Sequence, residues 1–327
     1  MLTNNTGISL SLAVWLCSDS YDHSDDPNTI SATTLLKPIR EIVLGSQNSH
    51  LLKTGDISTL IASSMGTSLH DGIEASWLNV KDDKSALEKL GIPEKVRNSI
   101  LINPTKEELY DGCIPVYLEK RSTKKVGNYT ISGKFDLVLN GRLEDYKSTG
   151  VYSYIMQSNN DKHTQQGSIY RWINPDIITE DTMAIQYIFT DWSKLSSLRE
   201  PKYPKTKLLE QLFNLMTVPE TDRFVKGIVS EIDRLKDAKQ ADLPRCTDKE
   251  LWVKPTVWKY YKDPKKTARS TKNFDNYTDA SLRLSKDGSV GVVKEIKGQV
   301  TKCKYCNVVD ICDQARELKA AGLLKIV

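Results

Sequence analysis

The sequence predicts an α/β protein, with a mixed central sheet flanked by helices and a small C-terminal module held by cysteines. Two patterns predict the core: apolar residues at helical spacing over residues 56–77, and three consecutive strand-like segments between residues 114 and 148. Three cysteines within ten residues, at 303, 306 and 312, predict the module. At 327 residues, the chain can bury one large core or two ordinary ones.

Helices are predicted where apolar residues recur every three or four positions. The first begins after Asp56, which is placed to act as its N-cap, and ends at Trp77. Its apolar positions are Leu60, Ile61, Met65, Leu69, Ile73 and Trp77. Further helices are predicted over residues 162–172, 205–216, 220–236 and 314–324, and a polar loop over 18–26.

Strands are predicted in the middle of the chain. Residues 114–121 form the first, 122–128 a polar turn, and 129–139 the second strand. Asn140-Gly141 then gives the strongest short-range signal for a tight hairpin, with residues 143–148 as the returning strand. A later segment, 183–192, is rich in Ile, Tyr, Phe and Thr, which favours a further strand.

The hairpin brings charged residues together. If Asn140 and Gly141 form a two-residue turn, facing residues have numbers that sum to 281, so Asp136 faces Asp145. Like charges that face each other directly on neighbouring strands are destabilising unless a cation offsets them. Lys147 lies on the same face as Asp145, diagonal to Asp136. Two carboxylates and an ammonium suit metal-assisted hydrolysis of a phosphodiester, although a surface hairpin with hydrated charges is the alternative.

Four sequence elements resemble a known family. Residues 133–136 (GKFD) and 145–148 (DYKS) resemble the G-x-x-D and D-Y-K-T core of RecB-like PD-(D/E)xK nucleases. Residues 66–70 (GTSLH) resemble that family's upstream helix with its motif histidine, and 166–170 (QGSIY) match its Q-x-x-x-Y element. The four elements occur in the family's order over about a hundred residues. The resemblance implies a PD-(D/E)xK restriction-endonuclease-like core.

The resemblance also implies roles for individual residues. Asp136 and Asp145 would bind Mg²⁺ or Mn²⁺, and Lys147 would orient or activate the attacking water. His70 and Glu119 would join the metal shell. Taken alone, a histidine on an amphipathic helix is more often structural, and the alternative for Glu119 is a charge at a strand edge.

Gln166 and Tyr170 complete the predicted catalytic set. They lie four residues apart and share a helix face, a spacing that is also frequent by chance. The resemblance implies that they support the site or contact DNA.

The implied function is a divalent-cation-dependent DNA nuclease, an exonuclease by resemblance, acting in recombination, repair or replication. Residues 6–10 and 30–33 are similar in character to phage-encoded nucleases, and a recombinase or helicase is the expected partner. The rival from another class is a non-catalytic single-stranded DNA-binding protein with a structural metal module.

The spacing Cys303-x2-Cys306-x5-Cys312 is similar to the C-terminal triplet of the AddB nuclease domain and of CRISPR-associated adaptation nucleases. That similarity implies a four-iron, four-sulfur (4Fe–4S) cluster, which needs a fourth thiolate. The relatives supply it from an N-terminal cysteine before a proline, whereas this sequence has Lys37-Pro38. Cys246 is the candidate fourth ligand instead.

Other assignments of these cysteines stay open. Cys17 is the next candidate ligand, and Cys113 the last because strand-like apolar residues flank it. Four thiolates would also suit a structural Zn²⁺, although zinc ribbons usually have two C-x-x-C knuckles and this chain has one. Reduced, unliganded cysteines are the remaining alternative.

Charge and composition set the domain and location predictions. With 46 Lys and Arg against 42 Asp and Glu, the chain is not polybasic, so a nucleic-acid surface must be a local patch. Residues 254–272 hold seven Lys or Arg against one Asp, interleaved with Trp258, Tyr260 and Tyr261. This segment suits a single-stranded DNA path or, equally, a solvated basic face.

A composition change at residues 242–244 predicts a nuclease core over 1–242 and a basic, cysteine-containing module over 243–327. Residues 8–17 are apolar but too short to span a bilayer, and no Lys or Arg precedes Lys37. The sequence therefore predicts a cytoplasmic protein, in the host cytoplasm if phage-encoded.

Overall fold

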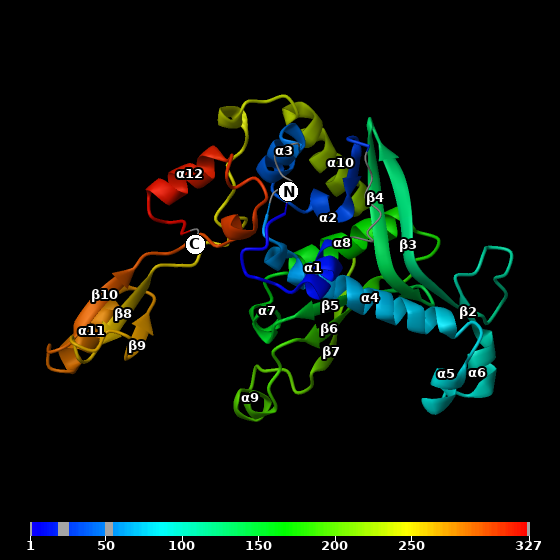
Figure 1. Cartoon of the computed structure of the whole chain (residues 1–327), viewed down its shortest axis with the longest axis horizontal. Helices are drawn as coiled ribbons and strands as arrows, with labels where there is room; N and C mark the ends of the chain where they lie inside the picture. The colour runs from blue at the N-terminus through cyan, green and yellow to red at the C-terminus, as the bar shows by residue number, and fades with distance from the viewer. Residues whose placement is uncertain (1, 19–25, 50–54, 326–327) are drawn as a thin grey trace. The chain divides into compact units, whose positions relative to one another are not determined.

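The computed structural model describes residues 2–18, 26–49 and 55–325, and the chain forms two compact units (Figure 1). The first unit comprises residues 1–37 and 53–231, and the second comprises 38–52 and 232–327. The division predicted at residue 242 stays a prediction, because compactness alone does not define a domain that folds independently. Among the described residues, no helix is both long enough and apolar enough to cross a membrane.

The first unit is built on a curled, seven-stranded mixed sheet, which confirms the predicted mixed α/β class (Figure 1). Its path runs β2-β3-β4-β5-β6-β7, and β1 pairs in parallel with β4. The β2–β3 and β5–β6 pairs are parallel, and the other neighbours on the path are antiparallel. The strands are β1 (Thr29–Ser31), β2 (Ile100–Ile102), β3 (Ile114–Val126), β4 (Tyr129–Leu139), β5 (Arg142–Thr149), β6 (Thr182–Phe189) and β7 (Leu208–Asn214).

Helices flank this sheet. Asp56 caps the predicted first helix, its side chain accepting a hydrogen bond from the Ser58 backbone N–H at 3.0 Å. Helix α4 packs on β3 and β5, and α8 packs on β3, β4, β6 and β7. The helices of this unit are α1 (Leu10–Cys17), α2 (Ala32–Leu35), η2 (Ile57–Leu60), α4 (Ile61–Asn79), α5 (Ser85–Lys89), α6 (Glu94–Ser99), α7 (Val151–Met156), α8 (Asn160–Ile173), α9 (Lys194–Arg199) and most of α10 (Val218–Leu235).

Two glycines let α8 approach the sheet closely. A Cβ on Gly167 would lie 2.2 Å from Met183 Sδ and 2.9 Å from a Leu215 methyl. A Cβ on Gly133, in β4, would lie 2.9 Å from the Tyr170 ring. Side chains at either position would push the helix away from the sheet, so these glycines set the distance between α8 and the strands that hold the candidate site.

The β4–β5 hairpin has the predicted register. Leu139 faces Arg142 and Leu137 faces Glu144, around a turn in which Asn140 and Gly141 have φ of +48° and +87°. Positive φ at both turn residues is what a type I′ hairpin requires. Counted from the turn, the last backbone pair is Leu137 with Glu144. Asp136 is the next residue along β4, so the strands separate where the candidate site begins.

Two secondary-structure predictions are wrong. Residues 122–128 are not a turn, because β3 continues to Val126 and reverses only at Gly127, which has φ of +56°. Lys124 is accommodated there because its Nζ lies 4.2 Å from the Trp172 ring centroid and donates to the Trp172 carbonyl at 3.0 Å. Residues 205–216 are not a helix, because Leu208–Asn214 pairs antiparallel with β6 as an edge strand.

The second unit combines helices with a small sheet in the order β10-β8-β9. Its elements are α3 (Ile39–Gln47), η3 (Gln240–Asp242), β8 (Val257–Tyr261), β9 (Lys272–Phe274), α11 (Tyr277–Lys286), β10 (Val292–Ile296), η4 (Lys302–Tyr305) and α12 (Asp313–Ala320). Helix α12 ends before the predicted residue 324, because Gly322 has φ of +69° and the Leu323 N–H returns to the Leu318 carbonyl at 2.9 Å. Most of the predicted loop 18–26 lies outside the described residues.

Candidate metal centre and hydrolytic site

Three elements of the first unit bring metal-ligating side chains together: α4 supplies His70, β3 supplies Glu119 and β4 supplies Asp136. His70 Nδ1 lies 3.6 Å from Glu119 Oε1 and 3.4 Å from Asp136 Oδ1. One ligand atom from each of the three residues lies within 4.8 Å of the others. A nitrogen and two carboxylate oxygens at this spacing could hold a divalent cation.

The ring of His70 is oriented by its second nitrogen. His70 Nε2 lies 3.2 Å from the Tyr146 carbonyl oxygen, so a proton on Nε2 would leave the Nδ1 lone pair directed at the two carboxylates. Burial lowers the pKa of His70, but hydrogen bonding to Glu119 and the charge of Asp136 outweigh it, and the net pKa is raised. Without a cation, the ring therefore tends to be protonated and pairs with both carboxylates.

Glu119 has a strained backbone. Its φ is +44°, in the left-handed region that non-glycine residues rarely adopt. Its neighbours stay in register, Leu118 with Leu137 and Lys120 with Phe135, but the residue itself leaves the ladder opposite Asp136. Such strain persists only where the surroundings impose it, and it clusters at functional sites.

Lys134 holds Glu119 in its ionised form, and sequence reasoning did not single out this lysine. Lys134 Nζ lies 2.7 Å from Glu119 Oε2. Burial raises the pKa of Glu119, but hydrogen bonds from His70 and Lys134 outweigh it, and the net pKa is lowered. The available signal was alternation along β4, which puts Lys134 on the same face as Asp136.

Asp136 is a buried carboxylate whose ionised form is destabilised by its surroundings. Burial and the negative charge of Asp145 raise the pKa of Asp136 to about 7, against Lys147, His70 and the Tyr146 N–H, which lower it. The Tyr146 N–H donates to Asp136 Oδ2 at 2.8 Å. If the β4–β5 ladder continued, this N–H would pair with a backbone carbonyl instead. A bound cation would relieve the cost of the buried charge.

Asp145 and Lys147 form a close ion pair on β5. Asp145 is 1% exposed, and Lys147 Nζ lies 2.5 Å from its Oδ2. Among the described residues, that oxygen nevertheless accepts no hydrogen bond of good geometry, so it keeps a lone pair for another ligand. Burial lowers the pKa of Lys147, but Asp145 and Asp136 outweigh it, and the ammonium stays charged.

Gln166 and Tyr170 of α8 lie beside Asp145. Gln166 Nε2 is 3.5 Å from Asp145 Oδ1 and donates to the Tyr170 hydroxyl at 2.8 Å. Tyr170 is 5% exposed and packs under Gly133. Of the two roles left open for this tyrosine, its burial favours support of the site over contact with DNA.

The structure therefore brings all seven sequence-predicted site residues of the first unit into one region in two groups. His70, Glu119 and Asp136 share a potential metal position. Asp145, Lys147, Gln166 and Tyr170 form the second group, joined to Asp136 by the charges of Asp145 and Lys147. Their roles in catalysis stay predictions.

Replacing Asp136 with Asn is expected to stabilise the protein when no divalent cation is present. The pKa of Asp136 is about 7 in the folded protein and 3.8 ordinarily. Between these pH values the carboxyl is ionised in the unfolded chain but still protonated in the folded protein, so the free energy of unfolding falls as pH rises. The gain should grow from about pH 4 to about pH 7 and then level off, at about 1–3 kcal/mol. Thermal unfolding across this pH range measures it.

Glu144→Gln is the matched control, because this neighbour on β5 pairs with Arg142 and accepts from Gln186 rather than joining the site. A melting temperature of Asp136→Asn that is unchanged or lower at pH 8 would show that the Asp136 charge is already compensated.

The four C-terminal cysteines of the second unit lie around one cavity. Cys246, Cys303, Cys306 and Cys312 all line it, and Cys303 and Cys312 are buried. Gln314 fixes Cys246 there, accepting from its N–H at 2.8 Å and donating to its carbonyl at 2.9 Å. Cys17 and Cys113 belong to the first unit, so Cys246 is the cysteine that completes the set within this unit.

The environment of the thiols suits a bound metal group. The buried Arg40 donates from Nε to Cys312 Sγ at 3.4 Å, a contact that would stabilise negative charge on sulfur. Burial raises the pKa of Cys246 to about 12 and that of Cys306 to about 11, so these two thiols stay neutral without a metal. Among the described residues, no three cysteine sulfurs lie within 4.8 Å of one another.

Comparisons with known proteins give little further information. Neither a protein-family model nor a curated protein matches the sequence. The crystal structure of SSO0001 is similar with a TM-score of 0.39 and 17% identity, over 67% of this chain and 81% of that chain. A phage-related exonuclease from Haemophilus somnus 129PT is similar with a TM-score of 0.24 and 14% identity, over 36% of this chain and 58% of that chain. Both TM-scores are low, so we base no functional conclusion on these likenesses.

Proposed function

We propose that this protein is a divalent-cation-dependent DNA nuclease with a RecB-like PD-(D/E)xK core. One observation carries the proposal: a histidine and two carboxylates from three elements share a potential cation position, beside a buried Asp145–Lys147 pair. Burial and the charge of Asp145 raise the pKa of Asp136 to about 7 at the centre of this group, and raised carboxyl pKa values are common at functional sites. The pattern fits a centre that is completed by a cation.

In this proposal His70, Glu119, Asp136 and Asp145 would hold Mg²⁺ or Mn²⁺, which would polarise the scissile phosphate and lower the pKa of the attacking water. Lys147 would keep its ammonium near that water or a phosphate oxygen, since about a third of its side chain is exposed. Lys134 would keep Glu119 ionised. Gln166 would orient Asp145, and Tyr170 would hold Gln166.

The finer assignments rest on the sequence resemblance. They are exonuclease action on DNA ends, a role in recombination, repair or replication, a phage origin with activity in the host cytoplasm, and a recombinase or helicase partner.

Incubation of the purified chain with labelled DNA tests the proposal. We expect products from end-labelled linear DNA with Mg²⁺ or Mn²⁺ and none after EDTA, and a closed circle should survive if the enzyme needs an end. DNA binding without cation-dependent products under any of these conditions would favour the rival single-stranded DNA-binding protein.

The cysteine-lined cavity is proposed to hold a 4Fe–4S cluster bound by Cys246, Cys303, Cys306 and Cys312, with a structural role. The spacing of the last three cysteines in the sequence, with one C-x-x-C knuckle rather than two, favours the cluster, and Zn²⁺ is the alternative.

A further inference from the structure

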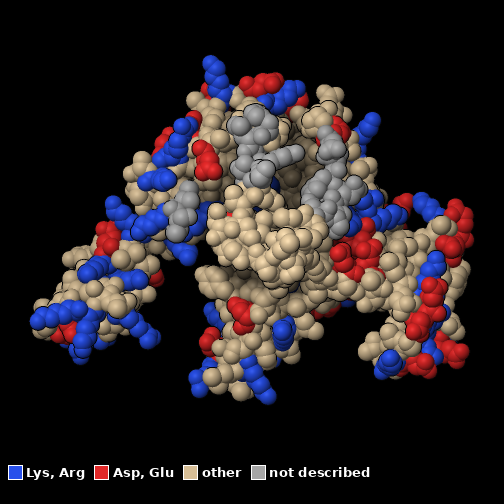
Figure 2. Space-filling model, in the orientation of Figure 1, with Lys and Arg blue, Asp and Glu red and all other residues tan. Residues whose placement is uncertain are grey.

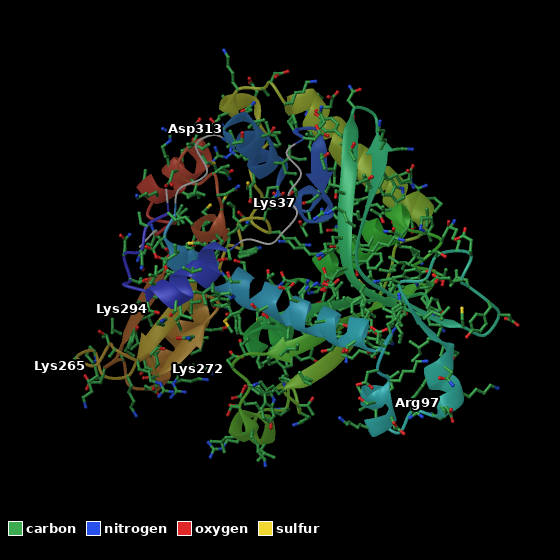
Figure 3. The ribbon with its side chains drawn as sticks, turned by 45° about the vertical axis from the view of Figure 1, so that its right-hand side comes forward. Lys37, Arg97, Lys265, Lys272, Lys294 and Asp313 are labelled. Carbon is green, nitrogen blue, oxygen red and sulfur yellow. The ribbon has the colours of Figure 1, made fainter. Side chains whose placement is uncertain are left out.

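The second unit contains a basic arm, defined here as residues 254–298, comprising β8, β9, β10 and α11. It has 11 Lys and Arg against 5 Asp and Glu, a net charge of +6, whereas the whole chain has only +4. The rest of the protein is therefore slightly acidic. Lys and Arg side chains gather over this arm in Figure 2, and Lys265, Lys272 and Lys294 are labelled on it in Figure 3.

Two of the arm's aromatic side chains are buried, Tyr260 and Tyr261, whereas Tyr277 on α11 is 56% exposed. Helix α11 packs on all three strands and covers one face of the sheet. On that face Tyr260 is fully buried and donates to Asp287, and the Trp258 ring packs against Tyr277 at 5.0 Å between centroids. On the opposite face, Tyr261 is only 6% exposed. Tyr260 and Tyr261 are thus unavailable to stack on bases.

The face opposite α11 carries a row of polar donors. In the strand register Lys294 faces Lys259, which faces Asn273. Alternation puts this row on the other side of the sheet from Trp258 and Tyr260. Lysines directly opposite each other on neighbouring strands repel and cost stability. Within the part of the chain that the structure describes, neither lysine forms an ion pair with an acidic side chain, and Lys294 Nζ lies 5.6 Å from the Tyr261 ring centroid. A bound anion would offset the repulsion between the two lysines.

The loop between β8 and β9 adds four exposed cations: Lys262, Lys265, Lys266 and Arg269. Its one acid, Asp263, accepts the Lys265 N–H at 2.9 Å through its carboxylate. The loop is also anchored, since Thr271 accepts the Lys262 N–H at 3.0 Å through its hydroxyl. The loop therefore holds four cations against one acid on an ordered framework.

The base of the arm is closed by backbone contacts. The Lys254 N–H donates to the Gln299 carbonyl at 3.0 Å, and the Gly298 N–H donates to the Thr256 hydroxyl at 3.2 Å. A Cβ on Gly298 would lie 2.1 Å from the Lys254 carbonyl oxygen, so only glycine allows this closure. The two ends of the arm are therefore held together at one point of the second unit. In the sequence, the arm lies between Cys246 and Cys303.

We propose that the basic arm binds the phosphate backbone of duplex DNA without reading its sequence. Cations on both a sheet face and a loop suit phosphates, and on the lysine face the Tyr261 ring is buried, so that face offers a single strand no β8 ring to stack on. This inference deepens the proposed nuclease function by naming a duplex as its substrate, and it rests on that function only for the choice of DNA as the nucleic acid.

Fluorescence anisotropy of the full chain, without added divalent cation, tests the arm. The probes are a labelled blunt duplex and an oligo-dT strand of equal length, titrated at several salt concentrations. Lys259→Gln with Lys294→Gln should weaken duplex binding about tenfold at 0.1 M salt, and should lower the slope of log affinity against log salt by about 1.8. The melting temperature should stay equal or rise, because opposed charges are removed.

Lys89→Gln with Lys95→Gln is the matched control: it removes the same charge from exposed positions of the first unit and should change neither quantity. Equal duplex binding by the arm variant and the wild type would overturn the inference, and so would a loss confined to oligo-dT. Because no cleavage is measured, failure of the nuclease proposal would leave this result unaffected, and the reverse also holds.

Discussion

DNA cleavage is expected to fall at least about a thousandfold when Asp136 is replaced with Ala. The substitution removes a ligand atom from the position shared with His70 and Glu119, and it leaves the His70 ring without one of its two carboxylate partners. Lys147→Ala should lower the rate about a hundredfold or more, because it removes the ammonium near the attacking water and leaves Asp145 buried without its counter-charge.

Initial rates on end-labelled linear duplex in Mg²⁺ measure both effects, with circular dichroism and thermal unfolding as checks on folding. Glu144→Gln is the control, since it changes a carboxylate on the same strand that lies on the opposite side from Asp145 and should keep nearly full activity. Retained cleavage by a folded Asp136→Ala or Lys147→Ala protein would contradict the proposed hydrolytic site.

The hairpin was predictable because its geometry is local. Asn140-Gly141 fixes the register, and the register fixes which residues face each other, so the proximity of Asp136 and Asp145 followed from a few neighbouring residues. The helix with His70 was also predictable, because both its cap and its apolar spacing are local signals.

The remaining features depend on contacts that are distant in sequence. Glu119 could be no more than a candidate, because its left-handed backbone lies at a break in the β3–β4 ladder that the local sequence does not signal. Lys134 was missed although alternation along its strand could have found it. Residues 208–214 have apolar spacing that suits a helix, but β6 offers an unpaired edge, and pairing with it decides their conformation. Trp258 and Tyr260 look like a stacking surface until α11 packs on their face of the sheet.

Loss of one cysteine from the cavity is expected to remove its metal and to unfold the surrounding unit. Cys303 is buried in a core with Leu251, Val300 and Val308, and the other three cysteines of the cavity lie in or against that core. In the full chain Cys303→Ser changes little bulk, so its effect should come from the lost ligand. Structural metal sites contribute about 10 kcal/mol or more to folding, far above the net stability of an ordinary domain.

Protein purified without oxygen should be brown with iron as its metal, whereas Cys303→Ser should be colourless and metal-poor. Limited proteolysis should then cut the second unit at low protease concentrations while the first unit resists. Cys113→Ser, in the first unit, is the control and should keep both colour and resistance. A Cys303→Ser protein with wild-type metal content would exclude this residue as a ligand. If the wild-type protein contains zinc in place of iron, the site holds a single Zn²⁺ ion and the proposed cluster is wrong. Either result would leave Asp136 and its neighbours unaffected, because the two sites belong to separate units with separate cores.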